Sequence, residues 1–180
     1  MSETPNQENI AKEGKEAYQR GEYATSVRLF QATAQGYASA GDKLSEAEML
    51  NNCGVAHLRA GDGKAALQAI EGTPATFATA GDTRRHGLAL GNLGDALEVV
   101  DRKQEAAENY QQSADLLEQA GEDDMRAHVL QSLSKLQLKS GRQIEALATM
   151  DAGLAGFKKP SVIQRFLKKL LRIPFKLMGS

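Results

Sequence analysis

Large and small side chains occur along the chain in columns that repeat every 40 residues. Two columns hold large residues: Ile10, Leu50, Leu90 and Leu130, and Phe30, Ile70, Tyr110 and Met150. Two further columns hold small residues: Gly14, Gly54, Gly94 and Ser134, and Ser26, Ala66, Ala106 and Ala146. A large and a small column four residues apart fall on one face of a helix. Because a small residue opposite a large one lets two helices approach closely, the pattern predicts interlocking helix pairs.

Residues that favour turns interrupt the helical pattern about every 20 residues. The breaks fall in two series: Gly21, Gly61, Asp101 and Gly141, and Gly41, Gly81 and Gly121. Glycine is the usual residue where a helix ends in a left-handed turn. We therefore predict four helix–turn–helix units over residues 8–40, 43–80, 83–120 and 123–157, preceded by a disordered N-terminus over residues 1–7. Since no unit can bury its apolar face alone, the units are expected to stack into an all-α, right-handed α-solenoid.

The third unit carries the motif of a known repeat family most clearly. Its motif positions are Leu90, Leu93, Gly94, Leu97, Asp101, Ala106, Tyr110 and Ala114. This order resembles the tetratricopeptide repeat (TPR). The resemblance implies a protein-interaction scaffold that holds a partner peptide or helix in a concave groove, lined by the first helix of each unit. The period of 40 residues, longer than the usual repeat of about 34, resembles the longer-helix subclass of spindle-orientation and G-protein-regulator scaffolds.

Two short segments carry the resemblance to that subclass. Residues 91–94 read Gly-Asn-Leu-Gly, as in the subclass, and residues 51–54 read Asn-Asn-Cys-Gly. The resemblance implies that Asn52 and Asn92 bind the backbone of a partner peptide. An Asn side chain has both a donor and an acceptor, so it can pair with a peptide N–H and C=O without reading the sequence. The subclass tends to place an Arg four residues earlier, where this chain has Glu48 and Leu88.

Counting along the first helix of each unit places a mixed set of side chains on the concave surface. The candidate partner-binding residues are Lys12, Lys15, Asn52, Arg59, Asn92, Asp95, His128, Lys135 and Lys139. Val55 and Val99 fall on the same surface. The four lysines are expected to attract acidic groups of a ligand. For any single residue of the set, the alternative interpretation is an ordinary solvated helix surface.

Composition limits the chemistry. The 22 basic and 23 acidic residues leave a net charge of -1, which argues against general polyanion binding. Specific nucleic-acid binding is not expected either, because no aromatic platform accompanies the basic residues of 158–180. Cys53 is the only cysteine, so an internal disulfide and a multi-cysteine zinc site are excluded, and a reducing, cytoplasmic location fits. His57, His86 and His128 are scattered, and no set of side chains forms a catalytic constellation. We therefore expect no enzyme activity, no cofactor and no bound metal.

We find no sequence pattern typical of a signal peptide or of a membrane-spanning helix. The first 30 residues contain no apolar run of the signal-peptide type. No segment reaches the roughly 18 consecutive apolar residues of a membrane-spanning helix. The sequence therefore predicts a chain that does not cross a membrane.

Residues 158–180 differ from the rest of the chain because they carry seven basic residues and no acidic one, whereas residues 1–157 carry 15 basic and 23 acidic residues. Apolar and basic side chains occupy opposite halves of a helix expected to begin near Ser161 and to end at Pro174. The residues expected to act in this tail helix are Arg165, Phe166, Lys168, Lys169, Leu170, Arg172, Phe175 and Lys176. Three roles remain open: a cap on the last repeat, a peripheral anchor on an anionic inner membrane face, or a ligand that folds back into an acidic solenoid.

Overall fold

The computed structural model describes residues 7–156, and every regular element within them is an α-helix. The helices are α1 (Gln7–Gln19), α2 (Tyr23–Ala40), α3 (Lys43–Ala60), α4 (Gly63–Ile70), α5 (Thr73–Thr79), α6 (Thr83–Val99), α7 (Lys103–Gln119), α8 (Asp123–Lys139) and α9 (Gln143–Gly156). The helix α1 begins at Gln7, one residue before the predicted start of the first unit. The predicted amphipathic tail helix lies outside the described residues.

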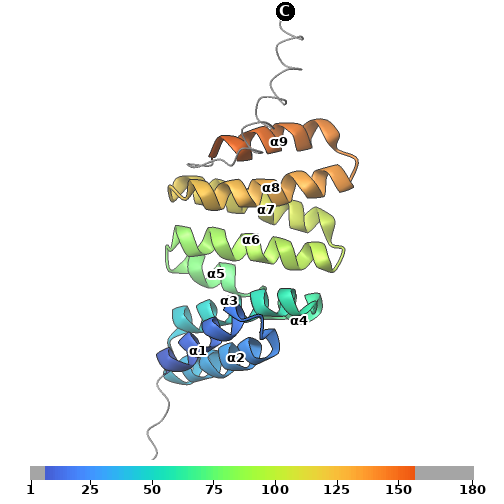
Figure 1. Cartoon of the computed structure of the whole chain (residues 1–180). Helices are drawn as coiled ribbons and strands as arrows, with labels where there is room; N and C mark the ends of the chain where they lie inside the picture. The colour runs from blue at the N-terminus through green and yellow to red at the C-terminus, as the bar shows by residue number, and fades with distance from the viewer. Residues whose placement is uncertain (1–6, 157–180) are drawn as a thin grey trace, which may run out of the picture.

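The helices form a stack in which each packs against its neighbours in the sequence, from α1 and α2 at one end to α9 at the other (Figure 1). The first helices of successive units also meet directly, since α3 contacts α6 and α6 contacts α8. Side chains 41 residues apart join them: Arg59 Nε donates to Tyr18 Oη at 3.2 Å, and Lys139 Nζ donates to Glu98 Oε1 at 2.7 Å. The predicted all-α solenoid of stacked hairpins is therefore confirmed.

Most helices end near a residue in the left-handed backbone conformation, and aspartate side chains cap the start of three of them. The glycines at positions 21, 41, 61, 81, 121 and 141 all have positive φ angles, between 71° and 84°. Asp101 takes the corresponding position in the third unit, with φ of 63°, where the other units of its series have glycine. The side chains of Asp42, Asp62 and Asp82 each accept a hydrogen bond from the backbone N–H three residues later, which caps α3, α4 and α6. The predicted breaks are thus helix ends.

Small residues allow the two helices of a hairpin to cross closely. A Cβ atom placed on Gly94 of α6 would lie 2.7 Å from the ring of Tyr110 on α7. Gly54 faces Ile70 even more tightly, and Gly14 faces Phe30. The small and large columns of the sequence therefore meet, as the repeat pattern predicts.

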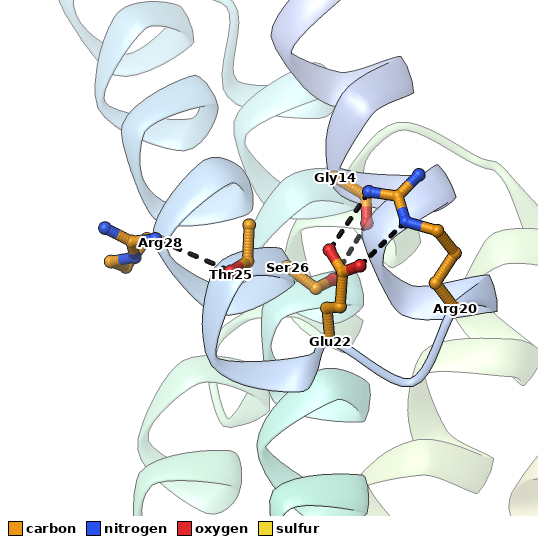
Figure 2. A network of polar contacts seen from close by, with 6 residues as sticks. All are labelled: Gly14, Arg20, Glu22, Thr25, Ser26 and Arg28. Atoms are coloured by element: carbon orange, nitrogen blue, oxygen red, sulfur yellow. Dashed lines mark hydrogen bonds and ion pairs between the residues drawn. The ribbon is translucent and has the colours of Figure 1, made fainter.

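Serine hydroxyls reinforce the crossing in the first and last units. Ser26 Oγ of α2 donates to the Gly14 carbonyl of α1 at 2.9 Å (Figure 2). In the last unit the roles of the two helices are exchanged, because Ser134 Oγ of α8 donates to the Ala146 carbonyl of α9 at 2.8 Å. Both serines are buried. The crossing point is therefore close enough for a side chain to reach the backbone of the opposite helix.

The second unit departs from the predicted pair of helices. Its second helix is broken into α4 and α5, with the chain turning at Glu71 and Gly72. Pro74 explains the break, because it has no N–H to donate to the Ile70 carbonyl and is tolerated only in the first turn of a new helix. The helix α5 then places Phe77 in a cluster with Ala47 and Ala89, so the interrupted part of this unit still contributes a large side chain to the core.

Replacing Gly94 with alanine should destabilise the protein. The new methyl group would overlap the Tyr110 ring, and such overpacking lowers the free energy of unfolding by about 1–3 kcal/mol. The control is Gly36→Ala in α2, where a Cβ meets only the flexible Gln7 side chain and the gain in helix propensity is about 1 kcal/mol. Urea denaturation would measure both, and equal effects of the two variants would contradict the close crossing.

Candidate binding groove

The first helices enclose a hollow of about 560 Å³ between α3, α6 and α8, which we term the central groove. It is lined by Val55, Leu58, Arg59, Asn92, Asp95, Glu98, Val99, Tyr110 and Lys139. Four of the residues predicted from the sequence, Arg59, Asn92, Asp95 and Lys139, therefore line one groove. They come together because the stacked first helices place residues about 40 positions apart side by side.

The other predicted residues are distributed over smaller hollows or the open surface. Asn52 and Lys15 line a hollow of about 280 Å³ that shares Val55 with the central groove. Lys15 also lines a hollow of about 290 Å³ with Lys12. His128 and Lys135 of α8 are exposed and line none of these three hollows.

A tyrosine hydroxyl and two carboxylates form the polar centre of the groove. Tyr110 Oη donates to Asp95 Oδ1 at 2.6 Å and lies 3.3 Å from Glu98 Oε2. Burial and the two carboxylates raise the pKa of Tyr110 far above its ordinary value, so the hydroxyl remains a neutral donor. Tyr110 is anchored at this place by its ring, which packs against Gly94.

Asp95 is held in an environment that disfavours its charge. Burial raises the pKa of the Asp95 carboxyl, and the nearby Glu98 carboxylate raises it further. The hydrogen bond from Tyr110 and the charge of Arg59 act in the opposite direction without cancelling the effect of burial. Perturbed carboxyl groups in a groove are typical of binding and catalytic sites.

The other polar side chains of the groove already have hydrogen-bond or ion-pair partners within the fold. Lys139 Nζ pairs with Glu98 Oε1 at 2.7 Å, so this predicted groove lysine already has an acidic partner within the fold. Arg59 is bound to the Tyr18 hydroxyl, and the Asn92 amide donates to Asn51 Oδ1 at 3.2 Å. These contacts fix the orientation of the groove side chains.

Three residues of the groove network escaped the sequence analysis. Tyr110 was assigned only to a packing column, and Glu98 and Asn51 were not considered. Both Glu98 and Asn51 lie 41 residues from a predicted groove residue, Lys139 and Asn92 respectively. A search for polar pairs at this spacing would have found them.

Several features bear on other kinds of chemistry. Cys53 is buried, and burial raises the pKa of its thiol to about 11, so the thiol is protonated at neutral pH. Within residues 7–156, no group of three His, Cys, Asp or Glu side chains is placed to hold a metal ion. None of the helices in this range combines the length and the apolar character needed to cross a bilayer.

Comparison of this chain with solved structures identifies its fold. Nearly identical TPR-like repeats from a kinesin light chain of Podosopora anserina match it with a TM-score of 0.76 at 14% sequence identity, over 97% of this chain and 90% of that chain. MamA matches with a TM-score of 0.61 at 15% identity, over 91% of this chain and 85% of that chain. The chain therefore has a tetratricopeptide-like fold, as the motif of the third unit predicts. No family model matches the sequence, and neither does any curated protein.

Removing the charge of Asp95 should stabilise the fold in a pH-dependent way. The folded pKa of Asp95 lies above its ordinary value of 3.8, so the folded state binds this proton more tightly than the unfolded state. Ionised Asp95 therefore lowers the free energy of unfolding. This penalty is complete above the folded pKa and disappears as the pH falls below about 3.8.

The Asp95→Asn variant keeps an acceptor for Tyr110 and removes the charge. We expect it to raise the free energy of unfolding at about pH 7 and to raise it less at about pH 4. Urea denaturation at the two pH values would measure the difference, with Asp115→Asn on the exposed surface of α7 as the control. The same gain at both pH values would show that burial does not disfavour the Asp95 charge.

Proposed function

We propose that this protein is an interaction adaptor that holds a peptide or helix of a partner protein along the groove of its first helices. The observation that carries this proposal is the central groove itself, which combines aliphatic walls with oriented polar groups. Val55 and Val99 offer apolar contact, while Asn92 and Asp95 offer a donor and acceptors. Such a mixture suits a peptide, whose backbone and side chains need both kinds of contact.

The two asparagines extend the proposed site beyond the central groove. Asn52 lines the adjoining hollow, which shares Val55 with the central groove. An extended peptide laid across the first helices would therefore pass from Asn92 to Asn52. Residues 91–94 match the Gly-Asn-Leu-Gly of the longer-helix TPR subclass, which supports backbone binding by these side chains.

The adaptor proposal predicts that Asn52→Ala combined with Asn92→Ala weakens capture of a partner. Two backbone-binding amides would be lost, and each such hydrogen bond contributes about 1 kcal/mol, so binding should fall about tenfold or more. Affinity purification from the native host, quantified by mass spectrometry, would compare this variant with the unmodified chain.

The matched control is Gln112→Ala combined with Gln119→Ala, both exposed on α7 and away from the groove. Melting temperatures of all three proteins should agree, which separates binding from stability. Unchanged capture by the asparagine variant would remove Asn52 and Asn92 from the site.

A second candidate function is attachment to an anionic membrane surface through residues 158–180, with the repeats as a platform. The observation in its favour is charge segregation, since all seven basic residues of this segment stand without an acidic one. Basic side chains near an anionic bilayer contribute about 1 kcal/mol each. This arrangement would keep the protein in the cytoplasm, at the inner face of the membrane.

The surface of α9, the last described helix, supports a competing role for residues 158–180, namely a cap on the solenoid. Ile144 is 85% exposed and Leu147 is 43% exposed on α9, the last helix described. An apolar segment that follows in the chain can cover such a face. Membrane attachment depends on the basic residues of the segment, whereas capping depends on its apolar residues.

Replacing Lys168, Lys169 and Arg172 with glutamine should reduce binding of the full chain to phosphatidylserine-containing vesicles by about a hundredfold, because three favourable charges are lost. Co-sedimentation with these vesicles, and with neutral phosphatidylcholine vesicles as the control, would measure the change. Absence of binding by the unmodified chain, together with a lower melting temperature after truncation at residue 157, would favour the cap.

A further inference from the structure

Within residues 7–156, Asp95 differs from the other carboxylates near the groove in forming no ion pair. Glu98 is paired with Lys139 at 2.7 Å, and Glu48 is paired with Arg85 at 3.3 Å. Among the described residues, Asp95 takes part in no ion pair, and its hydrogen bond comes from the neutral Tyr110 hydroxyl. Within residues 7–156, the groove therefore contains one partly desolvated carboxylate that forms no ion pair.

Arg59 forms no ion pair with Asp95 among the contacts of the groove. Arg59 lies close enough to favour the ionised form of Asp95. Its Nε, however, donates to Tyr18 Oη of α1 at 3.2 Å. The remaining cation of the groove, Lys139, is bound to Glu98. A counter-charge for Asp95 must therefore come from outside these residues.

The surroundings of Asp95 define the shape of a suitable counter-charge. Val55 and Val99 line the same hollow, and Val99 is 60% exposed, which is unusual for a valine and leaves apolar surface available. A Lys or Arg side chain has an aliphatic stem and a charged end, so it can contact valines and a carboxylate together. An acidic side chain would instead face the repulsion of Asp95 and Glu98, and a neutral one would leave Asp95 unbalanced.

The Asp95 carboxylate is also held in place before any ligand arrives. Tyr110 Oη fixes one oxygen at 2.6 Å, and the ring of Tyr110 is locked against Gly94. A preorganised acceptor loses less conformational entropy on binding than a mobile one. Tyr110 is therefore a positioning residue for Asp95.

We infer that the central groove selects partner peptides that present a Lys or Arg side chain to Asp95, with the aliphatic stem of that side chain against Val55 and Val99. This inference rests on the proposed adaptor function and specifies the chemistry of the partner. Asn92, one helical turn before Asp95 on α6, then binds the peptide backbone beside the cationic residue. Asp95 is the residue that determines specificity.

The test uses the full chain and a phage-displayed library of random 12-residue peptides as the probe. Panning should enrich peptides with a Lys or Arg at one fixed position. Panning on Asp95→Asn should lose this preference, whereas Asp115→Asn on the exposed surface of α7 should retain it. The substitution at Asp95 is isosteric and keeps an acceptor for Tyr110, so the variant is expected to fold.

A synthetic copy of the most enriched peptide makes the test quantitative. Fluorescence anisotropy should show about a tenfold or greater loss of affinity for Asp95→Asn, and a similar loss when the basic residue of the peptide is replaced with glutamine. Both changes together should lose little more than either alone, because they remove the same contact.

Two outcomes would overturn the inference, and they are distinguishable. Enriched peptides without a fixed basic residue, or additive losses in the combined measurement, would overturn the choice of partner chemistry and leave the adaptor function standing. Failure to enrich any peptide on the unmodified chain would overturn the adaptor function and this inference with it.

Discussion

The close crossing of the two helices within each hairpin is the contact on which the rest of the structure depends. It requires a small residue on the first helix wherever the second helix presents a large one, as Gly94 and Tyr110 do. Packing at this density holds the hairpin together, and interiors tolerate little change in volume. The same contact reaches the groove, because the ring that packs on Gly94 carries the hydroxyl that binds Asp95. Fold and candidate site thus share one side chain.

Polar contacts between first helices have a different role from this apolar packing. The pairs Glu98–Lys139 and Tyr18–Arg59 join neighbouring units at a constant spacing of 41 residues. Lys139 and Arg59 are largely exposed, and exposed pairs add little to the free energy of folding. They follow from the alignment of the first helices, which brings side chains 41 residues apart within reach of each other. The groove acquires its arrangement of charges from that alignment.

The second unit shows which features of the repeat are required. Pro74 interrupts its second helix, yet Phe77 is buried in the core between α3 and α6. The second helix of a unit can therefore be interrupted while a large side chain still fills the gap between units. Repeats that bury their apolar faces only against neighbours depend on this placement, because no other core exists.

Local pattern was sufficient to predict the helices, their glycine and aspartate breaks and the pairing of small with large columns, because each depends on neighbours within one hairpin. Counting along the helices also placed Arg59, Asn92, Asp95 and Lys139 on one surface. The interruption at Pro74 was readable in the same way but was not predicted. The sequence could not show that Lys139 is paired while Asp95 forms no ion pair within residues 7–156. Those facts depend on the lateral offset between stacked helices, where a shift of one turn would exchange one partner for another, and only tertiary packing decides that offset.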